Sequence, residues 1–513
     1  MDNNREIELK LAIHPDDVRA FCRLPFLREH AVARRLRQQV FNVYFDTAGC
    51  TLAKHGMSLR LRHVNGTRQQ TRQQTWQQTL KTAEAAGALQ QRGEWQQALP
   101  GGQLDLSLLR ATPLAKLKRR KQLHRLLKPK FTTTFTRTSW RLALAPGQQV
   151  EVALDEGDII CGDRHAPISE IEIELITGDV GAVFEVADAL LANINLTPAP
   201  LTKAARGYRL LDPAPPAPTS ATRITLRRKW PPPRAMRAII AAGLEHFAAN
   251  LDGALHRDDP EYIHQLRVAL RRLRTAFGIF RPADAQPLAD ELKWLCAALG
   301  QTRDLDVLVD VCLPALCAHL GDSRVAKQMM DTAEQHRRDA RVAARITLAS
   351  VRATALWLAL SRWLHTAEKA TPPRADLAEF AARQIRRRQH LLRRTTTLRT
   401  LTDAQRHRLR IAAKRLRYTI EFFADVTRSR RRFTKELALL QDALGAIHDN
   451  SVAGRMIADL AAPDVEFGRG WFAARTESQI AAADQSMRVL RRLEVKTRRN
   501  KHKHQSRVSA IFA

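Results

Sequence analysis

The sequence has few cysteines and no long apolar run. Its six cysteines form no CxxC pair, which argues against a zinc knuckle, a dithiol redox motif or a disulfide scaffold in a chain of 513 residues. No stretch of about 18 apolar residues could span a membrane. The polar start also lacks the apolar core of a secretory signal. We therefore expect a cytoplasmic protein without a membrane partner.

Acidic residues are too few to balance the basic ones. The chain has 84 Lys and Arg against 52 Asp and Glu, a formal net charge of +32. Such an excess destabilises a fold through self-repulsion unless an anion is the usual partner. Nucleic acid, an anionic membrane and polyphosphate all fit. Nucleic acid is disfavoured, because aromatic residues make up only 6% of the chain and stacking platforms are sparse.

Proline clusters divide the chain into parts of different character. The first part alternates apolar and polar residues with period two, which predicts strands. The part after the prolines repeats apolar residues at helical spacing and has few glycines. We therefore predict an α+β two-domain chain, with a β domain followed by an all-α domain. The predicted boundaries are 1–211 for the β domain, 212–234 for a linker, 235–490 for the helical domain and 491–513 for a basic tail.

Two strands of the first domain carry carboxylates on one face. Glu6 and Glu8 alternate with apolar residues, as do Glu170, Glu172 and Glu174. Five carboxylates in close register would repel one another unless cations lay between them. Mg²⁺, or alternatively Mn²⁺, prefers carboxylate oxygens and keeps positions open for phosphate. For a single such strand we would favour an exposed sheet with cross-strand salt bridges, but two acidic strands together with at least three basic ones favour a site.

Basic residues lie in strand register as well. Arg60 and Arg62 share a face, and further cations occupy other predicted strands or strand ends. Arginine forms bidentate contacts with phosphate, whereas lysine acts as a point charge. An acidic wall facing a basic wall would hold a metal–phosphate complex. The remaining members of the basic set are Lys10, Lys81, Arg92, Arg137 and Lys203.

These residues resemble a known family. Glu6-Ile-Glu-Leu-Lys10 resembles the ExExK signature of CYTH domains, the triphosphate tunnel metalloenzymes. The resemblance continues in the family's order over about residues 1–210. Its further segments are Tyr44-Phe-Asp-Thr47, Leu59-Arg-Leu-Arg62, Thr79-Leu-Lys81, Leu154-Asp-Glu-Gly157, Ser169-Glu-Ile-Glu-Ile-Glu174 and Lys203-Ala-Ala-Arg-Gly-Tyr208.

The resemblance implies an antiparallel eight-stranded β tunnel that binds triphosphate with a divalent metal. Lys10 and Lys81 would assist the attacking or leaving oxygen. The implied metal ligands are Glu6, Glu8, Glu170, Glu172 and Glu174. The implied triphosphate-binding set is Lys10, Arg60, Arg62, Lys81, Arg137, Asp155 and Lys203. One departure is Gln96, which stands where family members often have a second glutamate after Glu94.

The helical domain contains a duplicated basic motif. His264-Gln-Leu-Arg-Val-Ala-Leu-Arg-Arg-Leu-Arg274 aligns without a gap with His407-Arg-Leu-Arg-Ile-Ala-Ala-Lys-Arg-Leu-Arg417. The His and the three following cations fall within roughly 80° of one helix face. Leu299-Gly-Gln-Thr-Arg-Asp304 likewise parallels Leu444-Gly-Ala-Ile-His-Asp449. Because neither basic segment contains an acid, we favour anion binding over a solvated face or pairing with acids on neighbouring helices.

This half resembles CHAD domains, the conserved-histidine helical domains. The resemblance implies a duplicated helical bundle that binds inorganic polyphosphate in a basic groove. It also suggests association with polyphosphate granules. The implied polyphosphate-binding residues are His264, Arg267, Arg271, Arg274, His407, Arg410, Lys414 and Arg417.

The combined hypothesis is a metal-dependent inorganic triphosphatase whose helical domain binds inorganic polyphosphate. A non-catalytic polyphosphate scaffold is a competing hypothesis. A tunnel enzyme that acts on thiamine triphosphate or cyclises ATP is a second competitor, and a nucleic-acid binder is a third. The sequence leaves the oligomeric state and the substrate's chain length open.

Overall fold

The computed structural model describes residues 5–493 apart from short gaps. The gaps are 67–74, 83–84, 87–88, 118–122, 124, 213, 215, 283, 321–323, 367–375, 396, 428–430 and 461–464. The chain forms two compact units. One comprises Met1–Thr219, Leu251–Leu255 and Thr347–Glu368, and the other Ser220–Asn250, His256–Ile346 and Lys369–Ala513. The predicted basic tail lies outside the described residues from 494 onward.

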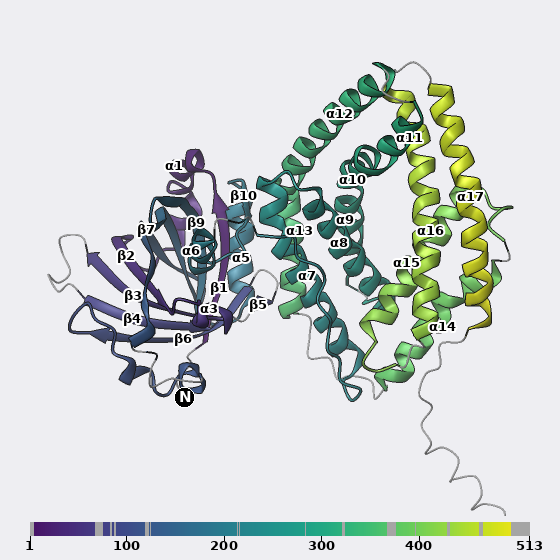
Figure 1. The fold of residues 1–513 in the computed structure, drawn as a ribbon. Helices are drawn as coiled ribbons and strands as arrows, with labels where there is room; N and C mark the ends of the chain where they lie inside the picture. The colour runs from purple at the N-terminus through teal and green to yellow at the C-terminus, as the bar shows by residue number, and fades with distance from the viewer. Residues whose placement is uncertain are drawn as a thin grey trace, which may run out of the picture. The chain divides into compact units, whose positions relative to one another are not determined.

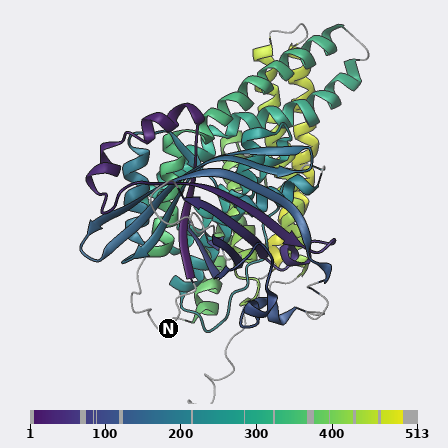
Figure 2. The same cartoon turned by 90° about the vertical axis from the view of Figure 1, so that its left-hand side faces the viewer.

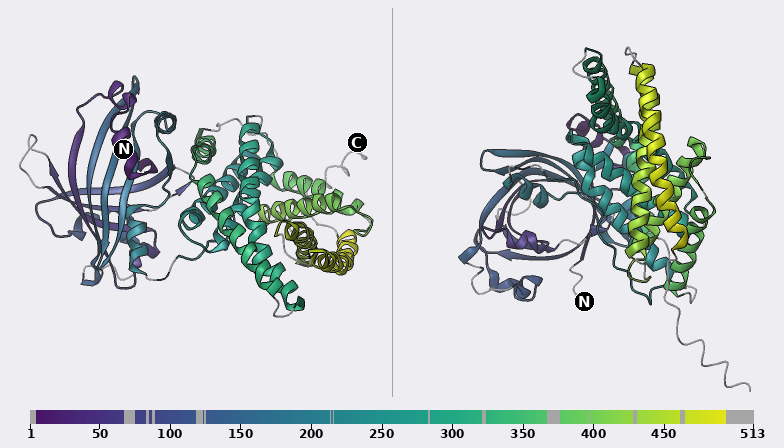
Figure 3. Two further views of the ribbon diagram at one scale, coloured as in Figure 1. Left: turned by 90° about the horizontal axis from the view of Figure 1, so that it is seen from above. Right: turned by 45° about the vertical axis from the view of Figure 1, so that its right-hand side comes forward.

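The first unit contains a closed antiparallel barrel (Figures 1 and 2). Eight strands are hydrogen-bonded in the order β1-β9-β8-β7-β2-β3-β4-β6, and pairing of β6 with β1 completes the ring (Figure 3, right). The predicted eight-stranded tunnel is therefore confirmed. The strands are β1 (Arg5–Ile13), β2 (Leu36–Asp46), β3 (Met57–Gly66), β4 (Thr75–Thr82), β6 (Leu89–Leu99), β7 (Lys128–Ala145), β8 (Gln148–Cys161) and β9 (Arg164–Thr177), with the short strands β5 (Ala85–Ala86) and β10 (Leu196–Pro198) beside them.

The period-two pattern sorts side chains between the two faces of the barrel wall. On β1, Leu9 and Leu11 are fully buried under the outer covering, whereas Glu8 and Lys10 face the lumen. Helix α5 (Gly181–Leu191) packs on β8 and β9, and helix α13 (Val351–Thr366) packs on α5 and β10. Much of the apolar core thus lies outside the wall, which leaves the inside for charged groups.

Helix α6 (Lys203–Leu211) brings a further cation to the lumen. The Thr202 hydroxyl accepts a hydrogen bond from the amide of Ala205 and caps the helix. Gly207 packs against the ring of Phe131 on β7, where a Cβ atom would lie 2.1 Å from the ring. This close approach holds the first turn of α6, and therefore Lys203, at the barrel.

The second unit is all-helical, as predicted. Its helices α8 (Pro260–Phe280) and α15 (Asp403–Phe422) carry the duplicated basic motif and pack on each other. α10 (Gly300–Val307) and α16 (Arg431–Met456) carry the duplicated Asp304 and Asp449. The other helices are α7 (Pro232–His256, shared between the two units), α9 (Gln286–Ala298), α11 (Leu313–Leu320), α12 (Arg324–Leu348), α14 (Leu377–Arg394) and α17 (Val465–Arg492). The first unit adds α1 (Val18–Phe21), α2 (Pro25–Glu29) and α3 (Thr51–Lys54).

One predicted linker segment is helical. Pro232 and Pro233 form the first turn of α7 rather than extended chain. Proline is tolerated there because first-turn amides have no partner within the helix.

Within the described residues, no single helix is long and apolar enough to cross a bilayer. One bent pair, Arg324–Leu348 with Val351–His365, meets the criteria of length and composition together.

The contact between Gly207 and Phe131 predicts a stability effect. Gly207→Ala should destabilise the barrel by about 1–3 kcal/mol, because the methyl group overpacks against a buried ring. Differential scanning calorimetry measures the change. Gly470→Ala in α17 is the matched control: nothing lies within 4 Å of its Cβ position, so it should gain up to about 1 kcal/mol. Equal effects of the two substitutions would contradict the packing argument.

Candidate functional site

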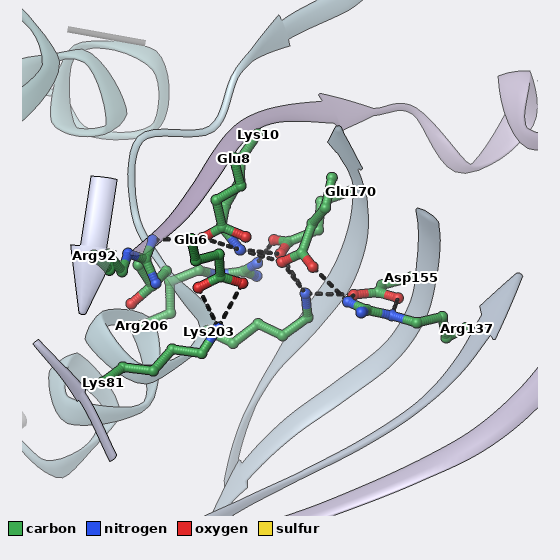
Figure 4. Close-up of polar contacts among 12 residues, drawn as sticks. Glu6, Glu8, Lys10, Lys81, Arg92, Arg137, Asp155, Glu170, Lys203 and Arg206 are labelled. Atoms are coloured by element: carbon green, nitrogen blue, oxygen red, sulfur yellow. Dashed lines mark hydrogen bonds and ion pairs between the residues drawn. The ribbon is translucent and has the colours of Figure 1, made fainter. Parts of the chain in front are cut away.

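The barrel lumen is lined by charged side chains from nearly every strand (Figure 4). β1 contributes Glu6, Glu8 and Lys10, and the register places Glu174 opposite Glu8 and Glu172 opposite Lys10. The predicted carboxylates therefore do meet on adjacent strands. They form two clusters with different surroundings.

The inner cluster consists of Asp155, Glu170 and Glu172, whose carboxylate oxygens lie within 4.8 Å of one another. Lys203 Nζ lies 2.6 Å from Asp155 and 2.5 Å from Glu170. Glu172 accepts hydrogen bonds from Lys10, Arg137 and Lys203. The cations that we expected between these carboxylates are thus supplied by the chain itself.

These contacts keep the inner cluster charged despite its burial. Burial alone would raise the pKa of Glu172, but the charges of Lys10, Lys203 and Arg137 hold this pKa well below its usual range. Burial would likewise lower the pKa of Lys203, yet Asp155, Glu170 and Glu172 raise it. The opposite charges of Glu172 and Lys203 thus stabilise one another in a low-dielectric interior.

The outer cluster consists of Glu6, Glu8, Glu94 and Glu174. Among the described residues, four cations contact each cluster, but the outer one has four carboxylates instead of three, and Lys10 lies 3.5 Å from Glu8. Lys81 Nζ lies 2.6 Å from Glu6 and 3.4 Å from Glu94. Arg92 lies 2.8 Å from Glu8 Oε1, an oxygen that has no hydrogen bond of good geometry.

Glu174 is the least compensated member of the outer cluster. Its carboxylate has no ion pair or hydrogen bond within the described part of the chain. Burial, together with the charges of Glu6 and Glu8, raises its pKa to about 7. A carboxylate-rich donor set with one member that lacks an ion pair suits a hard divalent cation. The carboxylate oxygens of the inner cluster all contact cations, whereas in the outer cluster Glu6 accepts from Lys81 and Glu174 has no such contact with a described residue.

The opposite part of the lumen is cationic. Arg62 donates to the amide oxygen of Asn42 at 3.0 Å and has no carboxylate partner among the described residues. Burial and the charges of Arg60 and Arg137 lower its pKa to about 9. Arg60 lies 3.8 Å from Glu94 and lowers the pKa of the buried Tyr44 below its usual value. An anion near Arg60 and Arg62 would relieve this repulsion.

The lumen has little free space. Its cavity measures about 30 Å³, because bridging side chains fill the barrel. A bound anion must therefore displace some of the internal ion pairs.

Reasoning from the sequence missed some members of this site. Arg206 reaches Glu170 at 3.2 Å from α6, and its spacing three residues after Lys203 on a helix is a signal that could have found it. Tyr44 was not predicted as a site residue from the sequence. Asp155 was predicted to bind triphosphate, but its carboxylate holds Arg137 and Lys203.

The helical unit contains a separate cavity of about 1670 Å³. Ten Lys and Arg side chains line it, against four carboxylates. Seven of the eight predicted residues are among the lining residues: His264, Arg267, Arg271, His407, Arg410, Lys414 and Arg417. Arg274 is not; it lies near Arg415. The other lining cations are Arg223, Arg272, Arg303, Arg455 and Arg475.

The cavity's basic groups are poorly neutralised. Burial and the neighbouring Arg410 and Arg271 lower the pKa of Lys414 to about 7. Burial and nearby arginines lower the pKa of His264 to about 3. Arg410 Nη2 lies 4.0 Å from Asp449 and has no closer carboxylate among the described residues. Positive charge is thus held here at a cost that an anion would remove.

The duplication is imperfect at one position. His448 occupies the place in α16 that Arg303 occupies in α10, and its Nδ1 lies 3.3 Å from Nδ1 of His407. Burial and Arg410 lower the pKa of His448 to about 3, and burial lowers the pKa of His407 as well, which favours the neutral forms. At this duplicated position the second copy of the motif therefore has an imidazole where the first has a guanidinium.

Comparison with known proteins identifies both parts. Residues 4–208 match the CYTH domain family, and residues 238–458 match the CHAD domain family. An inorganic triphosphatase from Haemophilus influenzae is 33% identical over 213 residues, covering 40% of the chain and 55% of that protein. The chain thus spans about half the length of this curated relative.

Solved structures of both kinds are similar to the chain. The CHAD domain from the plant Ricinus communis is 32% identical, covers 55% of the chain and 99% of its own, and has a TM-score of 0.49. A Hippeastrum protein, described as a putative adenylyl cyclase with a dominant triphosphatase activity, is 17% identical, covers 40% of the chain and 95% of its own, and has a TM-score of 0.30. The chain therefore belongs to the proteins that join an N-terminal CYTH domain to a C-terminal CHAD domain.

Proposed function

We propose that the barrel hydrolyses inorganic triphosphate to diphosphate and phosphate with a divalent metal, Mg²⁺ or Mn²⁺. The observation that carries this proposal is the division of the lumen into an under-neutralised carboxylate cluster and an under-neutralised arginine wall. A metal–triphosphate complex supplies both missing charges at once. The similarity of this region to an inorganic triphosphatase supports the choice of substrate.

Substrate binding on this proposal is an exchange of ion pairs. The phosphates first meet Arg60 and Arg62, the lumen cations with the weakest carboxylate contacts. They then compete with Glu172 for Lys10, Arg137 and Lys203. Since the free cavity is small, this exchange also excludes water from the phosphoryl chain.

Each lumen residue then has a defined task. Glu6, Glu8 and Glu174 would hold the divalent cation, with Glu94 beside them. A bound divalent cation supplies Lewis-acid polarisation of a phosphoryl group. Lys10 and Lys81 neutralise charge on the attacking or leaving oxygens, and the arginines orient the chain for in-line displacement.

The helical unit, we propose, binds inorganic polyphosphate in its cavity. The duplicated helices α8 and α15 both present cations to this space. Polyphosphate is a flexible chain with closely spaced charges, so it can satisfy cations on both helices without base-stacking platforms.

The first test of the barrel uses a substrate panel of triphosphate, thiamine triphosphate, ATP and long polyphosphate, each with and without metal.

The carboxylate cluster predicts the first activity result. Glu6→Gln/Glu8→Gln should reduce metal-dependent phosphate release from triphosphate at least about a hundredfold, since even the loss of an outer-sphere partner costs roughly 10–100-fold. Glu29→Gln, at an exposed position on α2, should retain activity. Equal phosphate release from all three proteins would refute Glu6 and Glu8 as metal ligands, whereas no release from any of them would make the barrel a binding scaffold.

The poorly neutralised cations of the cavity predict opposite effects on affinity and stability. Arg267→Gln/Arg410→Gln should weaken long-chain polyphosphate binding by about tenfold or more per arginine. The same change should raise the melting temperature of the ligand-free protein, because buried like charges are removed. Triphosphate hydrolysis should be unchanged. Unaltered polyphosphate affinity would refute the cavity as its binding site.

Lys414 predicts a pH signature. Its folded pKa of about 7 lies below the unfolded value, so the protonated form destabilises the free protein. This penalty is complete below about pH 7 and vanishes as the pH rises through the unfolded value of 10.5. An anion in the cavity raises this pKa, so binding at about pH 8 should take up about one proton. Calorimetry in two buffers of different ionisation enthalpy measures the uptake, which Lys414→Gln should abolish and Lys327→Gln should retain.

A further inference from the structure

A second group of arginines lies outside the cavity of the helical unit. We call it the arginine patch: Arg274, Arg281, Arg387, Arg388 and Arg415. It joins three helices. Arg388 of α14 donates to the carbonyl of Gly278 in the last turn of α8 at 3.1 Å. α15 packs on both α14 and α8.

The patch concentrates unpaired positive charge. None of its five members forms an ion pair with a described carboxylate, whereas Arg337, Arg345 and Arg406 elsewhere in the unit do. The members are close enough to interact. Burial and the charges of Arg387, Arg415 and Arg281 lower the pKa of Arg388 to about 10. Arg281, Arg387 and Arg415 are exposed, so a large ligand could reach them.

The patch shares two helices with the cavity. α8 places Arg267 and Arg271 in the cavity and Arg274 in the patch, a further rise of about 4.5 Å. α15 places Lys414 in the cavity, and the next residue, Arg415, belongs to the patch. A chain of phosphates that left the cavity along α8 would run toward Arg274 and Arg281.

We infer that the arginine patch binds the part of a long inorganic polyphosphate chain that extends beyond the cavity. The inference rests on the proposed polyphosphate binding and adds to it a preference for long chains. Nucleic acid fits less well, because the nearby rings pack on each other. Phe280 and Phe380 stack at 5.2 Å, and Phe380 meets Phe423 edge-on at 6.2 Å, which leaves no free platform for bases.

The test compares polyphosphates of graded length on the full chain. The patch variant is Arg281→Gln/Arg387→Gln/Arg415→Gln, which keeps the structural hydrogen bonds of Arg388. The charge-matched control is Arg324→Gln/Lys327→Gln/Arg432→Gln, at exposed positions on α12 and α16. Affinity for each length is measured by fluorescence anisotropy over a series of salt concentrations.

We expect the patch variant to lose about tenfold in affinity for long chains, since each exposed pair contributes roughly two- to threefold. The slope of log affinity against log salt concentration should become shallower by about two, because each of the three cations contributes roughly 0.7 on a single strand. The shortest chains should bind the patch variant as they bind the wild type, and the control should match the wild type at every length.

Loss at all lengths, loss at none, or an equal loss in the control would overturn the inference. A patch variant that loses single-stranded RNA binding but keeps long-chain polyphosphate affinity would instead assign the patch to nucleic acid. Failure of the cavity proposal can be distinguished from failure of the patch inference. If the cavity does not bind polyphosphate, Arg267→Gln/Arg410→Gln would leave the affinity for short chains unchanged.

Discussion

Glu172 contacts Lys10, Arg137 and Lys203 at the centre of the barrel, and the rest of the lumen is arranged around this charge balance. Removing charged groups from water costs several kcal/mol each, so these residues are tolerable only as a complete network. Breaking one such pair typically costs about 3–5 kcal/mol. The register of β1 on β9 and the anchoring of α6 by Gly207 both serve to complete it. The barrel wall can carry its apolar core outside because its interior is satisfied electrostatically.

The barrel lumen and the helical cavity both bury many cations, but they differ in how far carboxylates neutralise those cations. In the lumen, carboxylates neutralise most cations. A bound anion must therefore compete with these carboxylates for the cations, and a bound metal must take the place of the cations at the carboxylates. In the helical cavity, Lys414 and Arg410 stay poorly neutralised, and the free protein bears the repulsion. The first arrangement favours selectivity for a complex of matched charge. The second favours affinity for any dense polyanion of suitable shape.

Much of this architecture could be predicted from the sequence, because period-two carboxylates and a duplicated helical motif specify which face each residue occupies. The barrel and the helical domain agree with the structure, and seven of the eight residues predicted to bind polyphosphate line one cavity. The periodicity of a sequence predicts which face of a strand or helix a residue occupies. It does not predict how far along the barrel axis the residue lies, or how far it lies from a neighbouring helix. The sequence therefore could not separate Glu174, which lacks a partner among the described residues, from Glu172, which has three. It also could not show that Arg274 lies past the cavity or that Pro232 begins a helix.

The pairing of β1 has a consequence for the order of assembly. This strand is made before the others on the ribosome, yet Glu8 pairs in register with Glu174 and Lys10 with Glu172, more than 160 residues later. Lys81 on β4 and Arg92 on β6 can neutralise Glu6 and Glu8 earlier, but Lys10 has no partner strand until β9 emerges. Contacts so distant in sequence slow folding. The nascent strand is therefore a segment that a chaperone would need to shield, and its acidic face would help to keep it in solution meanwhile.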